Sequence, residues 1–276
     1  MWGGAKPSSN KVELGYIFKC YSKELPPVPI MVSTLYRDML NFFRNQFGSI
    51  ILLALLTALI SVVLGHVLSP ENEQSIALGG SAEMGNTAGM TFQQIVGQMS
   101  VDQQRILLKA SVAGTFASLV GNVLLASGLL TMIRLVSNHQ PVSVLLSIGL
   151  SAPLLPRLLL LIFLTTLLVQ LGLLLLLPGV LLAIAFSLAP IIATSDNLGA
   201  IKSMRLSSKL AYANIRLIAP AVLFWLLAKA VVLLLAMQFT MVSNLVSAVL
   251  LSVLSNLISA LLLIYLYRLY MLLRED

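Results

Sequence analysis

The chain has 276 residues, of which 58% are hydrophobic and only 10% are charged, and its formal net charge is +7. Soluble domains carry about 25% charged residues, so a soluble fold of this composition would have too little polar surface to cover itself. The composition excludes an ordinary soluble protein and predicts an integral membrane protein.

Residues 1–30 combine scattered charges with glycine and a proline-rich end, and they contain no continuous apolar core. They therefore do not match a cleavable signal peptide, and we expect a cytoplasmic tail with at most local order. Met31 follows directly, so either the tail is a real extension or the native start lies near Met31. The single cysteine, Cys20, lies in this tail and predicts neither a disulfide framework nor a metal site.

A helix needs about 20 apolar residues to cross a bilayer. Apolar runs close to this length recur six times, at residues 48–68, 110–136, 158–177, 179–194, 217–239 and 246–269. Blocks such as LLLLIFLTTLL are apolar all round, whereas membrane β-strands alternate polar and apolar residues. The predicted fold class is all-α: a polytopic bundle of six transmembrane helices.

The third and fourth runs meet at Pro178 and Gly179, where we expect a tight turn. Each leg has about 18 residues, which is at the short end of the spanning range. The pair therefore predicts a hairpin that is shallow or partly re-entrant.

Short segments that precede three of the spans predict surface helices. Residues 34–47 place Leu35 and Phe42 on one side and Arg37 and Arg44 on the other, as in a helix lying on the cytoplasmic membrane face. Similar amphipathic segments are expected from residue 143 and from residue 201. This spacing predicts three degenerate repeats of a surface helix followed by a transmembrane hairpin.

The long outer loop covers residues 69–109. Thr91 and Ser100 each stand three residues before a glutamine, which matches the capping box of a helix start. We expect the helix that starts at Ser100 to run on into the second span. That span carries Gly114, Gly121 and Gly128 at seven-residue spacing, and such small residues let helices approach closely in lipid.

The basic residues are distributed unevenly across the predicted membrane. The side away from the termini holds only Arg105 and Lys109, and Lys229 falls within a span. Because basic residues stay on the cytoplasmic side, both termini are expected there, and the charge predicts topology and not nucleic-acid binding. The fourteen basic residues on the terminal side are Lys6, Lys11, Lys19, Lys23, Arg37, Arg44, Arg134, Arg157, Lys202, Arg205, Lys209, Arg216, Arg268 and Arg274.

Residues for catalysis are sparse. His66 and His139 fall on opposite sides of the membrane, and no aspartate or glutamate lies within a span. No HExxH, GxSxG or glycine-rich phosphate loop is present. The sequence predicts no enzyme, no metal site and no cofactor.

Four polar side chains fall near the bilayer midplane when depth is counted along each span: Lys229, Asn256, Asn122 and Gln170. A lysine at this depth costs about 3 kcal/mol and must find a partner, find water or lose its proton. Hydrogen bonding to Asn256 is the simplest solution. The alternatives are a site for a solute or lipid headgroup, and snorkelling of the lysine towards the interface.

A basic stripe occupies one side of the segment that starts at residue 201. It is expected to face away from the apolar residues Ile201, Met204, Ala211 and Ile215. Basic residues of this kind either fix topology or attract anionic phospholipids, at about 1 kcal/mol for each charge. The candidate lipid contacts are Lys202, Arg205, Lys209 and Arg216.

Five segments resemble one known family: TLYRDMLNFFRNQF, VLGHVLSP, LIFLTTLLVQLG, APAVLFWLLAK and SNLISALLLIYLYRLYML. They are similar to the YciC-type proteins, multi-pass inner-membrane proteins of enterobacteria, from about residue 31 to residue 274. The resemblance implies a Gram-negative inner-membrane location. It brings no catalytic residue, because the family has none assigned. Residues 1–30 depart from the family, which favours a start near Met31.

These observations favour a non-enzymatic envelope protein that acts through helix packing and through contacts with lipid or protein. The alternative is a transporter or lipid-handling protein that uses the midplane cluster around Lys229. The bilayer itself is the one partner that the sequence predicts, and it predicts no particular protein partner.

Overall fold

The computed structural model describes residues 32–68, 100–138, 140, 143–173, 177–238 and 244–275. These residues form helices joined by short connections, and none of the described residues lies in a strand. Within this part of the chain six helical segments are long and apolar enough to cross a membrane. The predicted all-α fold with six transmembrane helices is therefore confirmed. The tail 1–30 and residues 69–99 of the outer loop lie outside the described residues.

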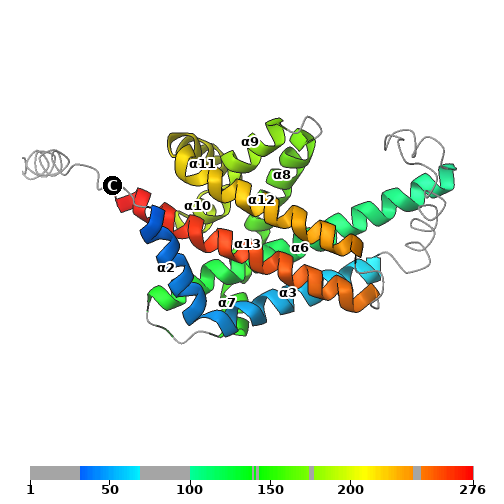
Figure 1. Cartoon of the computed structure of the whole chain (residues 1–276), viewed down its shortest axis with the longest axis horizontal. Coiled ribbons are helices and arrows are strands. Elements are labelled where there is room, and N and C mark those ends of the chain that lie inside the picture. Colours follow the sequence, from blue (N-terminus) through cyan, green and yellow to red (C-terminus); the bar gives the residue numbers. More distant parts are fainter. Residues whose placement is uncertain are drawn as a thin grey trace, which may run out of the picture.

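The last helix, α13 (Asn244–Glu275), packs against helices from both halves of the chain. In Figure 1 this helix runs along the length of the molecule, with α12 (Ile215–Gln238) on one side and α3 (Phe47–Leu68) on the other. The helix α2 (Val32–Asn45) crosses α13 near its C-terminal end. As predicted, α2 buries Leu35 and Phe42 and exposes Arg37 and Arg44.

The helix α6 (Val101–Ser137) begins directly after Ser100 and runs on into the second apolar run, as predicted. Its start is the capping box expected at Ser100: the Ser100 backbone N–H donates to Gln103 Oε1 at 3.0 Å, and the Gln103 N–H donates to Ser100 Oγ at 3.3 Å. This reciprocal pair satisfies two helix-start donors, so the helix forms in a polar stretch before the apolar run begins. Thr91, the other expected start, lies outside the described residues.

The glycines of α6 are not equivalent, although the sequence spaces them evenly. A Cβ at Gly121 would lie 1.9 Å from Ser61 Oγ on α3, and one at Gly128 would lie 2.9 Å from Leu53 Cδ1. A Cβ at Gly114 would meet no atom within 4 Å. The close approach predicted for this helix therefore exists at two of the three glycines, and it is made with α3.

The segment that starts at residue 143 differs from its prediction. The helix α7 (Val144–Ser151) buries Ser147 and Ser151 and exposes Leu145 and Leu150, so its outer surface is apolar. A 3₁₀ turn (Ala152–Leu154) joins it to α8 (Leu155–Leu173), and both helices belong to one apolar segment long enough to span. The prediction of an amphipathic surface helix is wrong here, because the serines face the protein: Ser151 Oγ donates to Ser127 Oγ on α6 at 3.2 Å.

The fourth span consists of α9 (Leu177–Phe186) and α10 (Ala189–Ser195). The turn predicted at Pro178 and Gly179 is wrong, because both residues lie in the first turn of α9, where proline is tolerated. α8 packs closely on α9: a Cβ at Gly172 would lie 2.8 Å from Gly179 Cα. Whether the hairpin sits at a shallow depth stays a prediction.

The order of one short helix and two long segments recurs three times along the chain. The helices α2, α7 and α11 (Ala200–Ala213) each precede an apolar pair, as the predicted repeat requires. Only α2 and α11 expose a charged face, so the middle unit departs from the pattern.

Candidate functional site

Lys229 forms a hydrogen bond with a residue that the sequence analysis did not predict as its partner. From α12 its Nζ donates a hydrogen bond to Ser255 Oγ on α13, and it lies 5.6 Å from the centroid of the Trp225 ring. The indole Nε1 of Trp225 donates to Ser259 Oγ at 3.4 Å, one turn further along α13. The half-buried ammonium group thus contacts the Ser255 hydroxyl and the face of the Trp225 ring.

Asn256 does not bind Lys229. It is 9% exposed, and its Nδ2 donates to Thr57 Oγ1 at 3.0 Å and to the Ala54 carbonyl at 3.3 Å, both on α3. Consecutive residues on an α-helix point about 100° apart. Ser255 therefore faces α12 while its neighbour Asn256 faces α3, and the predicted Lys229–Asn256 hydrogen bond is wrong.

The other two members of the predicted midplane cluster are also separate. Asn122 and Gln170 are exposed on the surface of α6 and α8, whereas the neighbours of Asn122, Gly121 and Val123, are buried. Counting residues along a span gives the height of a side chain but not its direction around the helix. The structure therefore brings none of the four predicted side chains together with another.

An apolar hollow of about 120 Å³ lies between α2, α12 and α13. Tyr36, Phe224, Trp225 and Tyr265 contribute to its walls, and Lys229 does not. The lysine is thus held by Ser255 beside this hollow without lining it.

The basic stripe of α11 is arranged largely as predicted. The helix buries Ser203, Met204, Ser207 and Ala211, and Ser207 Oγ donates to the Ala185 carbonyl of α9 at 2.7 Å. Lys202, Arg205 and Lys209 are exposed, as is Arg216 in the first turn of α12. On the expected apolar side, Met204 and Ala211 are buried, whereas Ile201 is 75% exposed and Ile215 is 37% exposed.

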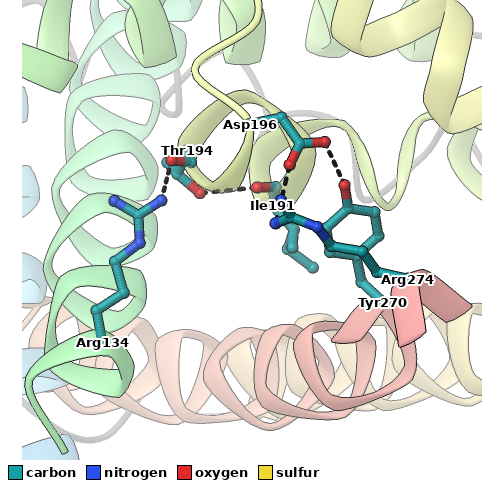
Figure 2. Close-up of polar contacts among 6 residues, drawn as sticks. All are labelled: Arg134, Ile191, Thr194, Asp196, Tyr270 and Arg274. Carbon is teal, nitrogen blue, oxygen red and sulfur yellow. Dashed lines mark hydrogen bonds and ion pairs between the residues drawn. The ribbon is translucent and has the colours of Figure 1, made fainter. Parts of the chain in front are cut away.

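Sequence reasoning missed a polar network at the end of α10 (Figure 2). Asp196 receives a hydrogen bond of 2.5 Å from the Tyr270 hydroxyl and lies 3.1 Å from Arg274 Nη1, both on α13. Arg134 of α6 donates to the carbonyl oxygen of Thr194, in the last turn of α10, where a helix end attracts cations. The network joins α6, α10 and α13 at the end of the bundle where α13 finishes, here called the terminal face.

One signal could have indicated this network. Asp196 is the only acidic residue between Asp102 and Glu275. An isolated acid among many basic residues is expected to pair with one of them. Arg134 and Arg274 were both predicted on the same side of the membrane as Asp196, and Arg274 is its partner. Among the described residues no group of three histidine, cysteine, aspartate or glutamate side chains is placed to hold a metal ion.

Comparison with known proteins agrees with the membrane architecture. The model of the family described as "Uncharacterised protein family (UPF0259)" matches residues 28–272. The chain is 79% identical over 249 residues to a UPF0259 membrane protein of Sodalis glossinidius, covering 90% of this chain and all of the relative. A relative from Serratia proteamaculans is 56% identical over 250 residues, covering 90% of this chain and all of that protein. One from Yersinia pestis is 50% identical over 249 residues, covering 90% of this chain and 97% of its own length.

No solved structure matches the chain significantly. The family match spans most of the sequence, and the relatives come from Gram-negative bacteria and carry the description of membrane proteins. With its six apolar helical segments, the chain belongs to the UPF0259 family of uncharacterised multi-pass membrane proteins.

Proposed function

We propose that this chain is a non-enzymatic protein of the bacterial inner membrane that contacts anionic phospholipids through α11. The observation that carries the proposal is the division of this helix into two sides. Ser203, Ser207 and Ala211 are buried against the bundle, and a row of basic side chains is exposed. The exposed row is formed by Lys202, Arg205 and Lys209.

Exposed apolar side chains on the same helix support a membrane contact. Ile201 is 75% exposed and Tyr212 is 52% exposed, next to the basic row. A helix that exposes both basic and apolar groups lies in the membrane interface, where each cation gains about 1 kcal/mol from anionic lipid.

The type of span and the charge asymmetry support the proposed location. Outer-membrane proteins of Gram-negative bacteria are β-barrels, whereas helical spans are typical of the inner membrane. Arg134, Arg216 and Arg274 lie at the helix ends on the terminal face, and Arg105 lies at the opposite end of α6. By the positive-inside rule the terminal face is cytoplasmic.

A reporter fused after the C-terminal residue tests this orientation. Green fluorescent protein there is expected to fluoresce, and alkaline phosphatase at the same position is expected to be inactive, because that enzyme needs the oxidising periplasm. A fusion between Arg105 and Lys109 should give the reverse pattern. An active phosphatase at the C-terminus would contradict the proposed topology.

Charge removal on α11 tests the lipid contact. The full chain and its Lys202→Gln/Arg205→Gln/Lys209→Gln variant are compared in nanodiscs of phosphatidylcholine with and without phosphatidylglycerol. Phosphatidylglycerol is expected to raise the thermal midpoint of the wild type, and the triple variant should lose most of that rise because three charges worth about 1 kcal/mol each are gone.

The matched control is Arg105→Gln/Lys109→Gln, which removes exposed basic residues at the opposite end of α6. Its response to phosphatidylglycerol should equal that of the wild type. An equal response of the triple variant, at low as well as high salt, would refute the α11 contact, since surface charges act most strongly at low ionic strength.

A further inference from the structure

The first half of α6 has one long side that none of the described helices covers. Ala117 and Gly121 face α3, whereas Leu119 and Val123 share a buried cluster with Leu161 of α8. In Figure 1 the first turns of α6 project beyond the other labelled helices. The exposed residues on the uncovered side, here called the α6 seam, are Val101, Leu108, Ser111, Thr115, Ser118 and Asn122.

The α6 seam has the spacing of a helix that packs on another helix. Every seventh residue from Val101 to Asn122 belongs to it, and Ser111 and Ser118 occupy intermediate positions. Alternating steps of three and four residues form the heptad pattern of a left-handed helix pair. Small side chains such as serine let two backbones approach closely in lipid. The spacing alone would suit any exposed helix side, so its polar members decide what covers it.

Asn122 is the member of the seam that lipid cannot satisfy. A Cβ at Gly121 would lie 3.4 Å from the carbonyl oxygen of Thr57, in the middle of α3, so Asn122 lies near the middle of the membrane. Its side chain is exposed, and its amide has no hydrogen-bond partner within the described part of the chain. Hydrocarbon offers neither a donor nor an acceptor, so this amide is stabilised by a hydrogen bond to another membrane helix.

A hollow beside the seam gives room for side chains of a docked helix. It has a volume of about 310 Å³, lies between α6 and α8, and is lined in part by Ser111, Thr115 and Phe163. Two of these residues belong to the α6 seam. A helix that packs on the seam can therefore place side chains in the hollow.

A second copy of this chain matches the seam in orientation, in hydrogen bonding and in charge. Copies of one membrane protein insert with the same topology, so two α6 helices meet in parallel and at equal height about a two-fold axis. Asn122 then lies opposite the same residue of the second copy. A carboxamide is both donor and acceptor, so two identical side chains satisfy each other. None of the seam residues is charged, so no like charges meet.

We propose that the chain forms a parallel, two-fold symmetric dimer in the membrane through the α6 seam, with Asn122 hydrogen-bonded across the axis. An asparagine at one position of a parallel heptad seam also fixes which residues lie opposite each other. Ser111, Thr115 and Ser118 allow the two helices to approach closely. The dimer goes beyond the proposed lipid contact of α11 and uses none of its basic residues.

Cysteine cross-linking in native membranes tests the contact. The full chain carries Cys20→Ser, which removes its one native cysteine, together with either Leu108→Cys or Ser111→Cys. Oxidation with copper phenanthroline is expected to give a band of twice the monomer mass from both variants. Lys109→Cys is the matched control, because it is exposed but lies off the seam, and it should give several times less dimer.

The contribution of the Asn122 amide is measured as a dissociation constant, by sedimentation equilibrium in density-matched neutral detergent. Asn122→Leu should raise the dissociation constant of the dimer about three- to thirtyfold, the loss expected for hydrogen bonds between membrane helices. Asn122→Gln keeps a donor and an acceptor and should retain most of the association. Gln170→Leu removes an exposed amide from α8 and should leave the constant unchanged.

Thermal midpoints separate a loss of association from a loss of folding. Asn122 is exposed, so Asn122→Leu is expected to keep the fold of the single chain. If that variant does not fold, the cross-linking difference between Leu108→Cys and Lys109→Cys decides the question.

Four results would overturn the dimer. Two are equal cross-linking from Leu108→Cys and Lys109→Cys, and equal dissociation constants for Asn122→Leu and Gln170→Leu. The third is a monomer in which the thiol of Ser111→Cys is shielded from a maleimide, because another segment of the chain would then cover the seam. The fourth is cross-linking of that thiol only to a protein of different mass, which would show a different partner.

Discussion

Replacing Gly121 by valine is expected to separate α3 from α6 and to lower the thermal stability of the protein in detergent markedly. A Cβ at this position would lie 1.9 Å from Ser61 Oγ and 3.4 Å from the Thr57 carbonyl oxygen. Ser61 Oγ donates to that carbonyl at 2.9 Å, so moving the serine also breaks a hydrogen bond. Overpacking of this kind costs about 1–3 kcal/mol, and the two added methyl groups of valine place the value at the upper end.

Gly114→Val is the matched control on the same helix. It carries the same change in helix propensity, but a Cβ there meets no atom within 4 Å. We expect the thermal midpoint of Gly114→Val to stay close to that of the wild type, while that of Gly121→Val falls. Equal midpoints for the two variants would show that α3 and α6 do not approach as described.

Replacing Lys229 by methionine is expected to stabilise the protein. A lysine at the centre of a span costs about 3 kcal/mol. The hydrogen bond to Ser255 returns about 0.6 kcal/mol and the contact with Trp225 about 0.5–1 kcal/mol. Methionine has a similar length without the charge, so the net gain is expected to be about 1–2 kcal/mol.

The measurement is the thermal midpoint of Lys229→Met in detergent, with Lys109→Met as the control, because Lys109 is exposed at the far end of α6. The same substitution in the bacterial chromosome should leave growth unchanged if the lysine has only a structural role. A stable variant that loses a solute- or lipid-dependent phenotype would revive the transport alternative.

The fold class could be predicted because composition and the length of apolar runs determine it directly. The capping box at Ser100 was also readable, since it depends on two residues three positions apart. Direction around a helix axis was harder to predict. Ser255 and Asn256 are neighbours at the same depth, yet one contacts α12 and the other α3. No pattern within one span shows which neighbour each face will meet.

The segment before α8 was misread for a related reason. The segment from residue 143 was expected to turn a polar face towards water, but in lipid a serine side chain gains more from packing against another helix. Ser147 Oγ donates to the Ser143 carbonyl at 2.9 Å, and Ser151 meets Ser127. The polar side of α7 is consequently its inner side, the opposite of the arrangement in a soluble protein.

The contacts of Asp196 also bear on the order in which the chain is built. Tyr270 stands 74 residues after Asp196 in the sequence, and Arg274 follows one turn later. During synthesis α10 is therefore made well before the two side chains that bind Asp196. Until the final turns of α13 are made, the Asp196 carboxylate lacks both of the partners that it has in the finished structure. A chain that ends before residue 270 would lack both the Tyr270 hydroxyl and the Arg274 guanidinium, so this junction of α10 and α13 would stay open.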